Sequence, residues 1–301
     1  MILVTGGTGF IGGELIKQFM DLEKPIRLLI QPSKSPPMLP VGLDLDVAIS
    51  SLTDERGLKA ALQDVDIVYH LAGVEQAGSD VNLHQLEVVE VNSLTRAARQ
   101  ANVKRFFYLS YLGADRASAF QIIKAKGIAE NIIKASGLNF TIFRSSMVYG
   151  KGDSFTNNLA RLINISPGLT FIPGDGSVLL QPVWVGDLVT CLVWALDLPN
   201  TENSIIELGG PEHLSFLNIL QEIATVLGKK RNFVEYNPVR WNSLTLVMES
   251  LVKGFPSTTF WTDYLAESRI CALDSIPRNF GINPSRFHQK IGYLIPQKST
   301  A

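Results

Sequence analysis

The chain has 301 residues, 46% of them hydrophobic, and a formal net charge of −1. It is therefore long enough to bury a large core, and it lacks the basic excess of a nucleic-acid-binding protein. Its two cysteines and four histidines lack the spacing of a metal site, so no metal is predicted. The longest apolar run, Leu188 to Leu196, is too short to cross a bilayer. Because no basic signal region precedes the first strand, we expect a cytoplasmic location.

The first predicted element is a short apolar strand, Ile2 to Val4, followed by a glycine-rich turn and an amphipathic helix. Gly6 permits a tight turn, Gly9 lets the backbone approach a pyrophosphate, and Gly12 lets the helix pack closely on the sheet. The N–H groups at the helix N-terminus attract the phosphate anion. The order of strand, turn and helix predicts nucleotide binding by the turn, which reads Thr5-Gly6-Gly7-Thr8-Gly9-Phe10-Ile11-Gly12.

This turn resembles the signature of the extended and atypical short-chain dehydrogenase/reductase superfamily. The resemblance implies a Rossmann fold that binds NAD(H) or NADP(H). The expected fold is α/β, a doubly wound parallel sheet with a smaller interleaved C-terminal region that closes the cleft. We assign residues 1–150 and roughly 170–210 to the Rossmann domain, and roughly 151–169 and 211–301 to the smaller region.

The second predicted strand, Ile26 to Ile30, ends where such folds recognise the adenosine ribose. A carboxylate there accepts a hydrogen bond from the 2′-hydroxyl, but this chain has Gln31 followed by Pro32-Ser33-Lys34. Lys34 could attract a 2′-phosphate, so NADP(H) is favoured. In the alternative interpretation Lys34 is a solvated loop residue and NAD(H) binds as well.

The third strand, Leu45 to Ile49, precedes Ser51-Leu52, where the resemblance places an Asp-Leu pair at the adenine edge. The fourth strand, Val65 to His70, is followed by Leu71-Ala72-Gly73. This segment resembles an element that runs beside the coenzyme ribose. The resemblance gives His70 a supporting role at the strand end and no acid–base role.

Catalysis in this superfamily uses a tyrosine, a lysine four residues later, and a serine or threonine after the fifth strand. In the predicted helix from Ser118 to Glu130 we favour Lys126 as the lysine, which leaves Ile122 in the tyrosine position. In the alternative register Lys124 is the lysine and Phe120 replaces the tyrosine. Neither isoleucine nor phenylalanine can donate a proton.

The fifth strand, Val103 to Ser110, is expected to end beside the nicotinamide. Similar proteins read Ser-Ser-Leu-Gly-Ala here, so Ser110 is retained and Tyr111 stands at the second serine. Tyr111 either supplies the missing acid or lines the pocket. The predicted catalytic residues are therefore Ser110, Tyr111 and Lys126.

Three further segments narrow the resemblance: Thr141 to Asp153, Gln181-Pro182-Val183, and Glu207 to Pro211. They are similar to atypical members, including epimerase/dehydratase-like and NmrA-like proteins, that are related to an accessory subunit of respiratory complex I. Such relatives keep the coenzyme site and often lack the tyrosine. Two functions follow: an oxidoreductase or epimerase-like enzyme on an unidentified small substrate, or a non-catalytic structural, assembly or redox-sensing protein.

The C-terminal half is predicted to alternate helices and strands. A helix over residues 238–255 is unusually apolar for a surface. We interpret it as a lid over the substrate cleft, with a peripheral membrane contact or a protein-complex contact as the alternative. The other expected elements are helices over 154–164, 187–196 and 216–227, a strand and turn over 170–176, and a strand over 204–208.

Overall fold

The computed structural model describes residues 1–33, 45–72, 82–251 and 259–295. These residues form two compact units. The first contains 1–33, 45–72, 82–145 and 185–208, and the second contains 146–184, 209–251 and 259–295. Residues 170–184, which the sequence analysis assigns to the Rossmann domain, are in the second unit of this division.

The first unit is built on a seven-stranded parallel sheet with the order β11-β6-β5-β4-β1-β2-β3. This order confirms the predicted doubly wound sheet. β1 pairs with both β2 and β4, so the chain changes direction across the sheet there, and ligands of such folds bind at that edge. The strands are β1 (Ile2–Thr5), β2 (Ile26–Ile30), β3 (Asp46–Ile49), β4 (Ile67–His70), β5 (Arg105–Tyr111), β6 (Phe140–Ser145) and β11 (Ser204–Leu208).

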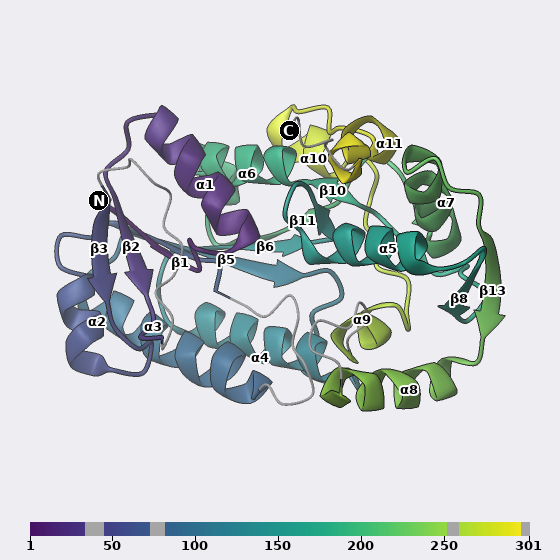
Figure 1. The fold of residues 1–301 in the computed structure, drawn as a ribbon. Helices are drawn as coiled ribbons and strands as arrows, with labels where there is room; N and C mark the ends of the chain where they lie inside the picture. Colours follow the sequence, from purple (N-terminus) through teal and green to yellow (C-terminus); the bar gives the residue numbers. More distant parts are fainter. Residues whose placement is uncertain (34–44, 73–81, 252–258, 296–301) are drawn as a thin grey trace, which may run out of the picture. The chain divides into compact units, whose positions relative to one another are not determined.

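Helices cover both faces of this sheet, which explains why its central strands are buried along nearly their whole length. On one face α1 (Phe10–Asp21) packs against α6 (Val185–Trp194), as Figure 1 shows. On the other face lie α2 (Glu55–Ala61), α3 (Glu90–Gln100) and α4 (Gln121–Ala135). A short 3₁₀ helix, η2 (Pro199–Thr201), leads into β11.

The segment before α3 differs from the prediction. The sequence indicates one regular helix over residues 83–101, but residues 85–89 form a π-helix, η1 (Gln85–Val89). Such a turn contains an extra residue and changes which side chains face inward. As a result Glu87 and Glu90 are buried, whereas Leu86 and Val89 are only partly buried.

The second unit contains three two-stranded sheets and several helices. β8 pairs with β13 and β7 with β10 in parallel, while β9 and β12 are antiparallel. The strands are β7 (Val148–Tyr149), β8 (Leu169–Pro173), β9 (Leu179–Leu180), β10 (Val183–Trp184), β12 (Leu214–Ser215) and β13 (Asn232–Tyr236). The helices are α5 (Ser154–Ile165), α7 (Phe216–Val226), α8 (Pro238–Leu251), α9 (Thr259–Tyr264), α10 (Ser275–Phe280), α11 (Phe287–Lys290) and η3 (Ile291–Leu294).

Local capping explains where the two long helices of this unit begin. The carboxylate of Asp153 accepts a hydrogen bond from Thr156 N at the start of α5. Ser215 caps α7 and forms a reciprocal pair of hydrogen bonds with Asn218. Such caps satisfy backbone N–H groups that would otherwise lack acceptors. α7 ends before Gly228, whose φ of 66° is left-handed.

Two of the three segments that narrowed the resemblance, Gln181–Val183 and Glu207–Pro211, meet through Gln181. Its Nε2 donates to Gly210 O at 2.7 Å, and its Oε1 accepts from Cys271 N at 2.7 Å. A Cβ at Gly209 would lie 2.4 Å from the Gln181 amide carbon. The amide therefore ties the two segments together, which gives these motif residues a structural role in the second unit.

Candidate functional site

The glycine turn joins the end of β1 to the start of α1 at the switch point of the sheet. Gly6 has a φ of 74°, and a Cβ there would lie 2.6 Å from Ala72 N. A Cβ at Gly12 would lie 2.2 Å from Gly6 O. Backbone would have to move to admit either side chain. The sequence analysis explained Gly12 by close packing of the helix on the sheet. In the structure the atom that excludes a side chain there belongs to the turn, Gly6 O.

Gly9 differs from these two glycines. Its φ of −80° and ψ of 175° suit any residue, and beyond its chain neighbours a Cβ would meet only Gly6 O, at 3.2 Å. A side chain at Gly9 would therefore require Gly6 O to shift by a few tenths of an ångström, a smaller demand than at Gly6 or Gly12. Close approach by a ligand would be a second physical reason for glycine here.

The start of α1 fits the phosphates of a dinucleotide. Among the described residues no side chain caps the helix at Gly9, and its first turn has no acidic residue. The first N–H groups of a helix have no partners within it and attract anions. A pyrophosphate would satisfy these donors, so the turn fits the coenzyme that the sequence predicts.

His70 ends β4 and positions the first residue of the turn. Its Nδ1 lies 2.7 Å from Thr5 Oγ1, and both side chains are buried. Burial, with a smaller contribution from the positive charge of Lys126, lowers the pKa of His70 to about 3. The ring is therefore neutral at neutral pH, and it stacks on Tyr108 with centroids 5.6 Å apart. This arrangement suits the supporting role that the resemblance implies.

Lys126 lies on the buried face of α4, whereas Lys124 is exposed. Its Nζ lies 2.8 Å from Glu87 Oε2 and donates to Leu109 O at 3.1 Å. The same Glu87 oxygen accepts a hydrogen bond from the Tyr108 hydroxyl at 3.1 Å. Lys126 and Glu87 are both almost completely buried, so the ammonium charge is neutralised inside the protein.

Ser110 is engaged in the same way by a second carboxylate. Its Oγ donates to Glu130 Oε1 at 2.7 Å, and its side chain is fully buried. Arg144 holds the same carboxylate through two hydrogen bonds of 2.9 and 2.7 Å. Hydrogen bonding to Glu130 raises the pKa of Arg144. The hydroxyl proton of Ser110 therefore points at a protein carboxylate.

No phenol occupies either tyrosine position that the sequence considers. Ile122 is buried on α4, and Phe120 precedes its first turn. Two other phenols flank the lysine: Lys126 Nζ lies 4.8 Å from the ring centre of Tyr108 and 5.3 Å from that of Tyr111. Burial raises the pKa of Tyr108 well above its usual range, whereas Tyr111 is partly exposed.

Other predicted coenzyme residues lie around the same edge of the sheet. Gln31 Nε2 donates to Glu90 Oε2 at 2.9 Å, and burial raises the pKa of Glu90. Leu71 N donates to Thr5 O at 3.1 Å. The Ser51 hydroxyl lies 2.9 Å from that of Thr53. Leu52 is buried beside Ser51, and Lys34 and Gly73 lie outside the described residues.

Sequence reasoning missed the three carboxylates Glu87, Glu90 and Glu130 as partners of the predicted residues. A glutamate in a helix is ordinarily a surface residue, so its identity alone carries no signal of burial. The described residues contain no group of three His, Cys, Asp or Glu that could hold a metal ion.

A family model described as NAD(P)H-binding matches residues 6–160, more than half of the chain. The chain belongs to this NAD(P)H-binding family. The predicted relationship to short-chain dehydrogenase/reductase proteins is confirmed, and the fold is of the oxidoreductase type.

Two curated relatives illustrate the range of the family. The chain is 27% identical over 215 residues to NADH dehydrogenase [ubiquinone] 1 alpha subcomplex subunit 9 of Arabidopsis thaliana, covering 69% of this chain. It spans about half of that relative's length, 53%. It is 27% identical over 252 residues to an NAD(P)H azoreductase of Xenophilus azovorans, covering 82% of this chain and 78% of the relative.

A solved structure agrees over almost the whole chain. An NADPH-dependent quinone oxidoreductase from Escherichia coli, in complex with NADPH, superposes with a TM-score of 0.78. The match covers 98% of this chain and 99% of the other at 18% identity. At this level of identity the likeness supports the fold.

Proposed function

We propose that the protein is an NAD(P)H-dependent reductase whose acceptor takes a hydride without receiving a proton from α4. The observation that carries this proposal is that buried carboxylates engage two of the three predicted catalytic residues, Ser110 and Lys126. Ser110 donates to Glu130, and Lys126 pairs with Glu87. Neither Ile122 nor Phe120 can replace the missing phenol.

The chemistry of the acceptor follows from this arrangement. The bound coenzyme supplies a hydride. An isolated ketone needs a proton on its oxygen as the hydride arrives, and loss of a general acid costs ~10²–10⁴-fold in rate. A conjugated acceptor such as an azo compound spreads the negative charge and can then take its proton from water. The azoreductase relative supports this acceptor class.

The chain's own residues would bind and orient the coenzyme. The glycine turn and the start of α1 would hold the pyrophosphate. Lys126 would approach the nicotinamide ribose, with two of its three N–H donors directed to Glu87 and Leu109. The preference for NADP(H) over NAD(H) rests on the charge of Lys34 and on the uncharged side chain of Gln31, whose amide donates to Glu90.

Tyr111 is proposed to line the acceptor site. It ends β5 and lies beside Lys126. If it only lines the site, Tyr111→Phe should reduce an azo dye at nearly the wild-type rate. If it is instead the missing acid, the variant should lose reduction of carbonyl substrates selectively.

The test of coenzyme binding is a fluorescence titration with NADPH and NADH. Gly9→Asp should abolish binding because a carboxylate would repel the phosphates, yet an aspartate at the helix N-cap stabilises the helix. The thermal midpoint of the variant is measured alongside, because the added Cβ also comes within 3.2 Å of Gly6 O. Binding by the folded variant would contradict the assigned phosphate site.

Turnover is tested by mixing protein-bound NADPH with an azo dye or an aliphatic ketone in a single-turnover experiment. Loss of absorbance from NADPH with the dye, and little with the ketone, would support the reductase. Tight binding without oxidation by either would favour the second candidate, a non-catalytic coenzyme-binding protein of a larger complex. The engaged Ser110 and the complex I relative favour that alternative. A cytoplasmic location stays a prediction.

A further inference from the structure

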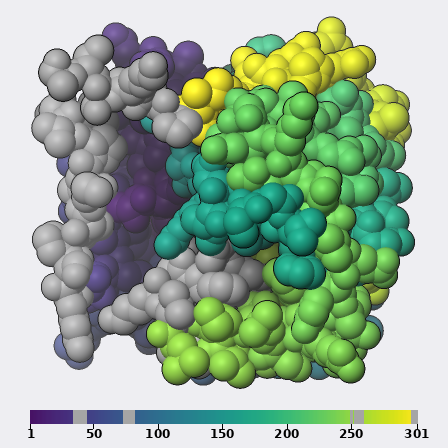
Figure 2. All heavy atoms as spheres, turned by 45° about the vertical axis from the view of Figure 1, so that its right-hand side comes forward, coloured from purple at the N-terminus to yellow at the C-terminus, as the bar shows by residue number. Residues whose placement is uncertain are grey.

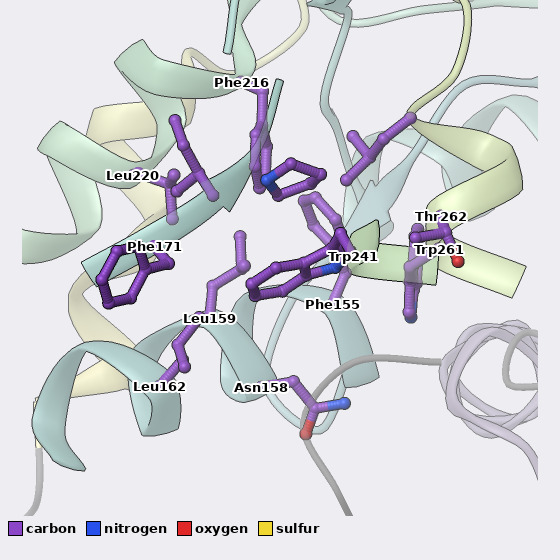
Figure 3. A pocket seen from close by; sticks show the side chains of 13 residues that line it. Phe155, Asn158, Leu159, Leu162, Phe171, Phe216, Leu220, Trp241, Trp261 and Thr262 are labelled. Atoms are coloured by element: carbon purple, nitrogen blue, oxygen red, sulfur yellow. The ribbon is translucent and has the colours of Figure 1, made fainter. Parts of the chain in front are cut away.

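The apolar pocket of the second unit leaves little room for a ligand. α8 lies at the surface of this unit, lime green in Figure 2, and no helix in the described ranges could span a bilayer. Trp241 of α8 extends among Leu159 and Phe155 (Figure 3), and the free volume of the pocket is about 40 Å³. Ligand sites usually have ~300–1,000 Å³. This pocket is therefore part of the packed interior of the second unit.

A polar recess beside α4 in the first unit is larger, with a volume of about 690 Å³. Its walls are α4, β6 and residues 113–116, the segment that follows β5. This segment packs directly on α4, since a Cβ at Gly127 would lie 2.4 Å from Arg116 N. Asp115 N also donates to Ile123 O on the same helix at 3.3 Å. Backbone contacts thus hold the segment in place, so the recess is preformed.

Among the described residues, three cations and two carboxylates line this recess. One cation and one carboxylate neutralise each other, because Arg144 Nη2 lies 2.7 Å from Glu130 Oε2. Hydrogen bonding to Glu130 raises the pKa of Arg144, with smaller contributions from the charges of Glu207 on β11 and of Asp115. Arg144 is therefore held by carboxylates of the protein, and the binding of a ligand depends on the other two cations.

These two cations are Arg116, in the segment 113–116, and Lys134, on α4. Both are exposed, and neither forms an ion pair or a side-chain hydrogen bond within the described ranges. Asp115 is the carboxylate that opposes them, so the lining keeps a positive charge. A phosphate monoester carries ~1.5–2 negative charges at neutral pH, and Arg and Lys bind it through charge-assisted hydrogen bonds. A carboxylate would offer a single charge to the two cations.

We propose that this recess binds a phosphate monoester of a molecule that carries several hydroxyl groups. Arg116 and Lys134 bind the phosphate. Asn131 and the Asp115 carboxylate, whose Oδ1 already accepts from Ala117 N, offer oxygen acceptors to the hydroxyl groups. The volume of about 690 Å³ accommodates more than a phosphate group alone. β1 and α1 do not contribute to the described lining, so the inference is independent of coenzyme binding.

The test is isothermal titration calorimetry of the full chain with glucose 6-phosphate as the probe, with and without excess NADPH. We expect binding that NADPH does not displace. Arg116→Gln combined with Lys134→Gln should weaken this binding by about tenfold or more, because each change removes a charge-assisted hydrogen bond. Both residues are exposed, so the fold should be retained. Arg56→Gln combined with Lys124→Gln is the matched control, because it removes the same charges from exposed residues outside the recess.

Further probes test the class of ligand. Glucose, which lacks the phosphate, and glucuronate, which carries one negative charge, should each bind about tenfold more weakly than glucose 6-phosphate. Asn131→Ala should weaken the binding of glucose 6-phosphate by about threefold and leave that of inorganic phosphate unchanged. Four results would overturn the proposal: no binding of glucose 6-phosphate, equal affinity in wild type and the Arg116→Gln, Lys134→Gln variant, displacement by NADPH, or glucuronate binding as tight as that of glucose 6-phosphate.

Discussion

The neutrality of His70 predicts how stability depends on pH. The ring is 1% exposed, and burial lowers its pKa to about 3, whereas an unfolded histidine titrates near 6.5. Between these values the unfolded chain binds a proton that the folded protein does not, so stability falls as pH falls from 6.5 towards 3. At about 1.4 kcal/mol per pH unit the loss is ~2 kcal/mol between pH 7 and pH 5.

The assay is urea unfolding of wild type and His70→Asn at pH 7, 6 and 5. The asparagine can keep a hydrogen bond to Thr5 but does not titrate. The free energy of unfolding of the variant should therefore fall by ~2 kcal/mol less than that of wild type between pH 7 and pH 5. His84→Asn is the matched control, because it makes the same substitution at an exposed histidine. Equal losses in wild type and His70→Asn would refute the reasoning.

Three further predictions concern the same unit. Lys126→Met or Glu87→Gln alone should lower the free energy of unfolding in urea by ~3–5 kcal/mol, because each variant leaves a buried group unpaired. Replacing both residues by apolar ones should recover most of that free energy. Gly12→Ala should lower the thermal midpoint sharply, since its Cβ would lie 2.2 Å from a carbonyl oxygen, whereas Gly13→Ala, with 3.9 Å to its nearest atom, should not. Ser110→Ala should cost ~1–2 kcal/mol of stability yet retain azo reduction; a loss of ~10²-fold or more in rate would identify it as catalytic.

Features governed by local rules were readable from the sequence. The second and last strands of the sheet begin and end at the predicted residues, 26–30 and 204–208. The caps follow from residue type as well: of Thr53 and Asp54, the two candidates next to each other in the sequence, Asp54 caps α2, and Ser215 caps α7, because capping depends on a few neighbouring atoms. The glycine turn was equally predictable, because its position between a strand and a helix restricts its conformation and its possible ligands.

The interior of the site was less predictable because it depends on contacts between distant segments. Nothing near Ser110 in the sequence indicates that Glu130 accepts its hydrogen bond, or that Arg144 holds that carboxylate. Likewise, the coenzyme preference was inferred from the lack of an acidic side chain at position 31. In the structure the carboxylate of Glu90 lies 2.9 Å from the Gln31 amide. Glu130 and Glu90 both lie on helices, where a glutamate is ordinarily a surface residue.

The π-helix at residues 85–89 makes the environment of Lys126 sensitive to chain length. An α-helix rotates by about 100° per residue, so removing one residue from a π-turn would rotate the preceding side chains by that amount relative to α3. Glu87 would then turn away from Lys126, and the ammonium group would be left with a backbone carbonyl and two aromatic rings. A single-codon deletion at this point would therefore alter the charge around Lys126 while leaving every residue of the glycine turn in place.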